Sequence, residues 1–213
     1  MKLLKVKASH FKNCYDNFTI DFTAKSKKTA EDCEYELQAV AENLYVYNTA
    51  AFVGKNASGK TTAIELLDCC YSILGEFCLE NKPYSYDGII LEIFFYHEGY
   101  IYRYNTELSP SETLSNKAAF LHQKLVCKQY YKTKSREIFS DEGFIPVPNI
   151  SELPEDTSIT FFVLKKKESR AVYFPCDGEG SNTYHMLFKA LKRFDISSKT
   201  LAAILKLFDG HIR

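Results

Sequence analysis

One short stretch of the chain carries the residue types best suited to chemistry. It reads, in order, Gly54, Lys55, Asn56, Ala57, Ser58, Gly59, Lys60, Thr61 and Thr62. The stretch fits the pattern G-x-x-x-x-G-K-[ST] of phosphate-binding loops. The glycines allow backbone N–H groups to turn toward one anion, Lys60 is expected to reach the β- and γ-phosphates, and the Thr61 hydroxyl is expected to hold Mg²⁺. Residues 54–62 therefore predict a binding site for ATP and Mg²⁺, with Lys60 as the catalytic residue and Thr61 as the metal ligand.

The segments on either side of this loop are expected to position it. Upstream, residues 50–53 form an apolar run that suits a buried parallel strand. Downstream, residues 63–74 predict a mostly buried helix with one polar stripe, and the positive end of its dipole would lie at the loop. The alternative is a glycine-rich turn that binds nothing. Glycine alone explains a turn, but it does not explain Lys60 and Thr61 at the start of a buried helix.

Elsewhere the alternation of apolar and polar residues predicts mainly strands. Residues 3–9 and 18–22 predict an opening hairpin, and residues 37–47 are again typical of a strand. A second hairpin is expected around His97-Glu98-Gly99, which separates two alternating runs at 89–95 and 100–107. The remaining expected elements are a strand pair at 118–131 and 136–139, strands at 158–164 and 171–174, and helices at 182–194 and 200–208.

Composition places the chain among globular proteins. A chain of 213 residues with a hydrophobic fraction of 46% is long and apolar enough for a packed core. The net charge is zero, so nothing global argues for a nucleic-acid or membrane surface. No apolar run approaches the ~18–20 residues of a membrane span, and the N-terminus alternates too strictly for a signal peptide. The 7 cysteines are scattered, which indicates free thiols in the cytoplasm.

The order of these motifs resembles the ABC-type ATPase heads of the SMC/RecF/OLD group. The resemblance is carried by His10-Phe11-Lys12-Asn13 after the first strand, by Phe18-Thr19-Ile20-Asp21-Phe22, and by Phe52-Val53 leading into the loop. Within the group, the chain is most similar to the bacterial AAA-type, OLD-like ATPases of phage-defence and abortive-infection loci. The resemblance implies that Lys12 and Asn13 flank the nucleotide. It also implies a dimer of ATPase heads with ATP between them, and DNA or an effector protein as a further partner.

The same resemblance implies a fold class and a domain plan. The class is α/β, a P-loop NTPase, as the N-terminal lobe of an ABC-type head with an antiparallel β-layer beside the P-loop strand and helix. Residues 1–213 would then be the N-terminal part of one P-loop ATPase domain, divided into a loop core at 1–75, a hairpin region at 88–140 and a helical segment at 181–210. The group hydrolyses ATP with an acidic strand end and a Ser-Gly signature, and neither occurs here. We therefore expect an ATPase whose first 213 residues are inactive alone.

Three functions follow from these observations. The first is an ATPase of this group that acts in DNA transactions or phage defence. The second is a nucleotide-binding switch that binds ATP, hydrolyses little of it and controls a partner effector. The third is a small-molecule kinase, which would need an arginine-rich lid soon after the loop. Residues 75–99 contain no arginine, which disfavours the kinase.

Basic and aromatic residues interleave in one further segment. The residues concerned are Lys124, Lys128, Tyr130, Tyr131, Lys132, Lys134 and Arg136. A nucleic-acid patch is one interpretation of this pattern. A solvated strand face is the other, and the net charge of zero favours it.

Overall fold

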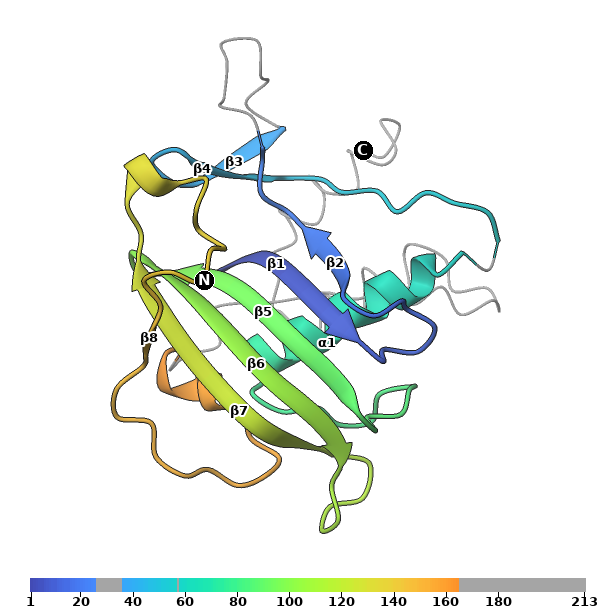
Figure 1. Cartoon of the computed structure of the whole chain (residues 1–213). Coiled ribbons are helices and arrows are strands. Elements are labelled where there is room, and N and C mark those ends of the chain that lie inside the picture. The colour runs from blue at the N-terminus through green and yellow to red at the C-terminus, as the bar shows by residue number, and fades with distance from the viewer. Residues whose placement is uncertain (26–35, 57, 165–213) are drawn as a thin grey trace, which may run out of the picture. The chain divides into compact units, whose positions relative to one another are not determined.

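The computed structural model describes residues 1–25, 36–56 and 58–164 (Figure 1). The chain divides into compact units at residues 1–171 and 172–213, so every described residue belongs to the first unit. The described residues form a six-stranded sheet, a two-stranded sheet and one α-helix, α1 (Lys60–Gly75). No helix in this part of the chain is long and apolar enough to cross a membrane.

The larger sheet is antiparallel between every pair of neighbours. Its order is β2-β1-β5-β6-β7-β8, and the smaller sheet is the hairpin β3-β4. The bounds are β1 (Lys2–Ser9), β2 (Phe18–Asp21), β3 (Leu37–Ala41), β4 (Leu44–Tyr47), β5 (Ile89–His97), β6 (Tyr100–Pro110), β7 (Ala118–Gln129) and β8 (Ile145–Pro146). Of two short 3₁₀ helices, η1 (Lys132–Lys134) lies between β7 and β8, and η2 (Ile159–Phe162) follows β8.

The two hairpins expected from the sequence are confirmed. β1 pairs with β2, and β5 pairs with β6 along its whole length. The β5–β6 turn places Glu98 at φ 44° and Gly99 at φ 85°, which are the positive values that a tight two-residue hairpin turn requires. Residues 37–47, expected as a strand, form the β3–β4 hairpin, which turns at Glu42 and Asn43.

The predicted helix at 63–74 is confirmed and lies across one face of the larger sheet (Figure 1). Its apolar positions recur at helical spacing, and Leu66, Cys69, Cys70 and Ile73 have no exposed surface. They pack against sheet residues such as Val6, Ile93 and Tyr104. Full burial of one leucine or isoleucine side chain contributes about 1.5–3 kcal/mol. Packing on the sheet therefore fixes the direction in which α1 presents its N-terminus.

The opposite face of the sheet is also covered. Phe94 points away from α1, between Ile93 and Phe95, because successive strand residues alternate between faces. It joins a second core with Leu44 and Val46 of β4 and with Ile138. A sheet that is buried on both faces explains why β5 reads as a nearly continuous apolar run.

The α/β P-loop fold class expected from the sequence is wrong. No parallel pair occurs among the described strands, and residues 50–53 do not form the expected strand before the loop. Ala50 and Ala51 are exposed there, and Val53 is 91% exposed. Four apolar residues do not by themselves distinguish a buried strand from a loop. Both edges of β1 are taken by antiparallel neighbours, β2 and β5. The described part is therefore a mostly antiparallel β protein with one helix.

Two smaller expectations are also wrong, and others fall outside the described residues. Residues 136–139 form no strand, and the only partner of β7 on that side among the described residues is the short β8. Residues 158–164, expected as a strand, contain η2, because the Ser158 side chain accepts the Thr160 N–H and starts a helical turn. The strand predicted at 171–174 and the helices at 182–194 and 200–208 lie outside the described residues.

Candidate phosphate-binding site

The predicted phosphate loop folds as a turn that leads directly into α1. The Ser58 N–H donates to the Lys55 carbonyl at 3.2 Å, which closes the turn. Gly59 precedes the helix at φ 86°, a left-handed conformation that glycine adopts without strain. A Cβ placed on Gly54 would overlap the Ser58 hydroxyl, so a larger residue there would require the Ser58 side chain to rotate away. Of the two glycines of the motif, Gly59 therefore has the clearer structural role. Ala57 lies outside the described residues.

Lys60 bridges this loop from inside. Its Nζ donates to the Gly54 carbonyl at 2.9 Å and to the Lys55 carbonyl at 2.7 Å. These two bonds hold the ammonium group across the loop and leave it one further proton to donate. The positive charge is therefore held at the backbone carbonyls of the loop, at the surface of the molecule.

The first turn of α1 is free to receive an anion. The helix has 16 residues, its cap residue Gly59 makes no side-chain capping bond, and its first turn contains no acidic residue. The N–H groups at the start of a helix have no intrahelical acceptor, and the dipole favours negative charge there. Thr61 is exposed and Thr62 is half-buried, and the Thr61 hydroxyl has no hydrogen-bond partner among the described residues. Thr61 is thus available as an oxygen ligand for a hard cation such as Mg²⁺.

The loop is anchored without the expected strand. Phe52 is half-buried and packs against the main core, whereas Val53, Gly54, Lys55 and Asn56 are exposed. Phe52 on one side and α1 on the other are therefore the two attachments of the loop to the folded unit.

The structure brings Lys12 to α1 but leaves Asn13 at the surface. Lys12 lies in the turn between β1 and β2, at φ 51°, and its Nζ contacts the Glu65 Oε2 at 2.5 Å. Glu65 follows Thr61 by four residues, so the two side chains lie on the same face of the helix. Asn13 is exposed. That Lys12 and Asn13 flank a nucleotide stays a prediction. In the structure, the Lys12 charge is paired with Glu65.

No local sequence pattern predicts this pair, although Glu65 lies on the polar stripe of the helix. Replacing Lys12 by methionine is expected to lower the free energy of unfolding by about 1–3 kcal/mol, because it leaves the Glu65 carboxylate nearly buried and without its charged partner. The Glu65 side chain is only 12% exposed. Urea denaturation of the full chain would measure the change.

The control is Lys132→Met, which removes a similar lysine from a pair with Glu42. That carboxylate is 69% exposed, so water replaces the lysine and the effect should stay below about 0.5 kcal/mol. Equal midpoints for the two variants would contradict a structural role for the Lys12–Glu65 pair.

The acidic side chains of α1 are engaged in ion pairs. Its two acids are both paired, Glu65 with Lys12 and Asp68 with Lys82 at 2.6 Å. Burial raises the pKa of the Cys69 thiol to about 12, so it stays protonated and unreactive at neutral pH. The described residues contain no group of three or more His, Cys, Asp or Glu side chains that could hold a metal ion. The start of α1 therefore offers donors suited to an anion, and neither acid of this helix is free to activate water.

No family model matches the chain, and no curated protein matches its sequence. An interpretation of the site therefore depends on its own geometry and on the motif.

Proposed function

We propose that the chain binds ATP with Mg²⁺ through residues 54–62. One observation carries the proposal: Lys60 is held inside a glycine turn at the uncapped N-terminus of a 16-residue helix. The N–H groups of the loop, the helix dipole and the lysine charge would then all attract an anion to the same position. A chain of phosphates is the ligand that can interact with all three. The fold itself gives no support, since the described part is not an α/β P-loop protein.

The residues present also fit a bound magnesium ion. Thr61 offers a free hydroxyl beside the phosphate position, and Mg²⁺ in such sites takes its other ligands from phosphate oxygens and water. The ion would neutralise part of the phosphate charge. Lys60 would supply a full positive charge to the phosphates, after its ammonium group exchanges one loop carbonyl for a phosphate oxygen.

Of the functions considered, binding with little hydrolysis by this chain has the better support. The two acids of α1 are engaged with lysines. Positioning a water molecule and stabilising the transition state both need further groups. The proposal is therefore an ATP-binding module whose hydrolysis, where it occurs, depends on groups beyond the described residues.

Isothermal titration of the full chain tests the proposal and the role of Thr61 together. ATP should bind more tightly with Mg²⁺ than without it, tripolyphosphate should compete, and adenosine should not. Thr61→Val keeps the side-chain shape but removes the hydroxyl, and it is expected to weaken binding of Mg²⁺–ATP roughly tenfold, equivalent to about 1.4 kcal/mol. Its affinity for metal-free ATP should stay unchanged.

Thr133→Val is a matched control, because Thr133 is also exposed and near the start of a helical turn. It should behave as the wild type. If adenosine competed as well as tripolyphosphate, the phosphates would not be the recognised part of ATP and the assignment would be wrong.

A further inference from the structure

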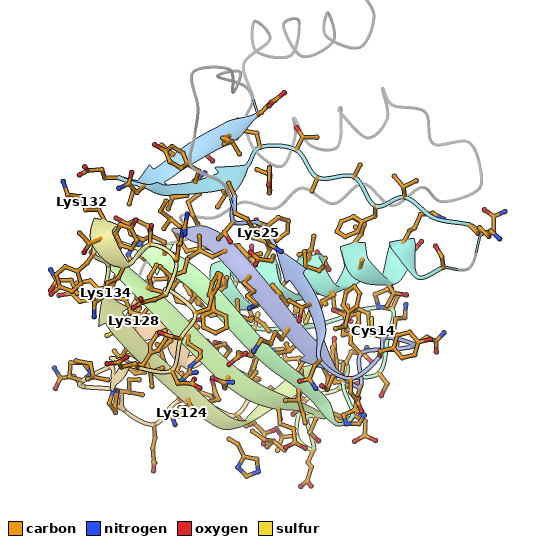
Figure 2. The ribbon with its side chains drawn as sticks, turned by 45° about the horizontal axis from the view of Figure 1, so that its top comes forward. Cys14, Lys25, Lys124, Lys128, Lys132 and Lys134 are labelled. Carbon is orange, nitrogen blue, oxygen red and sulfur yellow. The ribbon has the colours of Figure 1, made fainter. Side chains whose placement is uncertain are left out.

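A groove of about 740 Å³ lies away from the phosphate loop. One wall comes from the end of β2 and from the β3–β4 turn, and the other comes from residues 132–139. Two acidic residues line the groove, Asp21 and Glu137. Four basic residues line it as well: Lys25, Lys132, Lys134 and Arg136. Figure 2 shows Lys132 and Lys134 on one side of the molecule, with Lys25 across from them. Cations from two distant parts of the sequence are thus gathered in one depression.

Most of these charges are available to a ligand. Lys134 and Arg136 are exposed, and no carboxylate of the described residues pairs with either one. Lys132 contacts Glu42 at 2.8 Å, but both side chains are more than half exposed, so this pair is weak and exchangeable. Asp21 is occupied by the backbone N–H and the hydroxyl of Thr23. Since the whole chain has no net charge, the groove concentrates positive charge that the average composition conceals.

A smaller hollow of about 280 Å³ adjoins the groove. Lys134, Glu137 and Ile138 line both, and the smaller hollow adds Tyr130 and Tyr131. The Tyr131 side chain is a large aromatic group that is 55% exposed. Tyr130 is fixed, because its hydroxyl donates to the Glu42 carbonyl at 2.6 Å. The cations of the groove, which could bind a phosphate backbone, therefore lie next to the exposed aromatic ring of Tyr131.

The structure changes which residues of the basic segment belong to this surface. Lys128 has an internal role: its Nζ donates to the carbonyls of Glu137 and Ser140, each at 2.9 Å, and so holds the 137–142 segment in place. Lys124 is exposed on β7 but lines neither hollow. Lys25, far away in the sequence, lines the groove and joins the set.

We propose that this basic groove binds the phosphate backbone of a single-stranded nucleic acid, with a base stacked on Tyr131. Phosphates at regular spacing satisfy several cations in a row, and a base needs an open ring to stack on. A duplex keeps its bases paired and could not use Tyr131. No residue of the groove lies in 54–62, so the inference is independent of ATP binding.

The test is fluorescence anisotropy of the full chain with a labelled oligothymidylate of about 20 nucleotides, measured without ATP. With four phosphate contacts, the affinity should fall roughly 50-fold between about 50 and about 200 mM salt. The variant Lys134→Gln with Arg136→Gln should bind at least about tenfold more weakly and lose about 1.4 from the logarithmic salt slope. Tyr131→Ala should weaken binding roughly tenfold without changing that slope, and Tyr131→Phe should restore it.

Lys124→Gln is the matched control, since it removes one exposed lysine of the same segment from outside the groove. It should bind as the wild type does, and Lys134→Gln alone should not. All these positions are at the surface. If the double variant has a lowered melting temperature, the single variants replace it in the test. Absence of wild-type binding, equal loss in Lys124→Gln, or tighter binding of a duplex of equal length would overturn the proposal. Equal displacement by polyglutamate would instead identify a generic acidic partner, which also overturns it.

Discussion

Replacing Lys60 by alanine is expected to weaken ATP binding by about 2–4 kcal/mol, roughly 30- to 700-fold. Lys60 is the residue whose ammonium group is already held inside the loop, through the carbonyls of Gly54 and Lys55. Lys55 belongs to the same loop, but it is exposed and its side chain makes no bond within the loop. Under the proposed function, the charge that a γ-phosphate meets would therefore be supplied by Lys60.

The measurement is isothermal titration of Mg²⁺–ATP into wild type and variant. Lys124→Ala is the charge-matched control, because it removes one exposed lysine of β7, away from the loop. The loop carbonyls that lose their donor in Lys60→Ala are at the surface, where water replaces the lysine, so the melting midpoint should change little. Equal ATP affinity of wild type and Lys60→Ala, with both chains folded, would remove the basis of the proposed function.

Hydrolysis of ATP by the purified 213-residue chain is expected to stay at background, about 10³–10⁵-fold below the rate of an enzyme with its transition-state groups in place. Binding needs the loop N–H groups, Lys60 and Thr61. Turnover also needs a group that orients water and further donors around the γ-phosphate. The acids of α1 are paired with lysines, and Glu92 on β5 is likewise held by Lys7 at 2.7 Å.

Phosphate release by the wild type, measured against Lys60→Ala from the same purification, separates activity of the chain from contamination. Turnover that disappears in Lys60→Ala would show that a catalytic acid is present after all. Glu98 would then be examined first by Glu98→Gln, since its side chain is 80% exposed and lies in a turn. Glu92→Gln and Asp177→Asn would follow, and Asp177 lies outside the described residues.

Several elements could be predicted from sequence because their causes are local. The β5–β6 hairpin follows from two alternating runs separated by a short turn in which Gly99 accepts a positive φ value. The start of α1 follows from Gly59 and from apolar residues at helical spacing, and the order of loop and helix is part of the motif itself. For the same reason Lys60 and Thr61 could be selected as candidate site residues without any knowledge of the fold.

Other features depended on contacts between distant segments. Residues 50–53 are apolar enough for a strand, yet antiparallel neighbours occupy both edges of β1 and Val53 is left exposed. A local pattern does not decide whether residues 50–53 or another segment pairs with an edge of β1. The predicted α/β P-loop fold class was wrong for this reason.

The amino-acid sequence by itself determined the phosphate-loop motif, the helix after it and the hairpins, because each depends on residues within a few positions of one another. Only the tertiary structure paired Lys12 with Glu65, 53 residues apart, and placed Lys25 opposite Lys134 and Arg136. Such pairings require the sheet to form first, since its strand order sets which loops meet. Residue types alone therefore indicated what the chain could bind, and packing decided which of its charges are left free to do so.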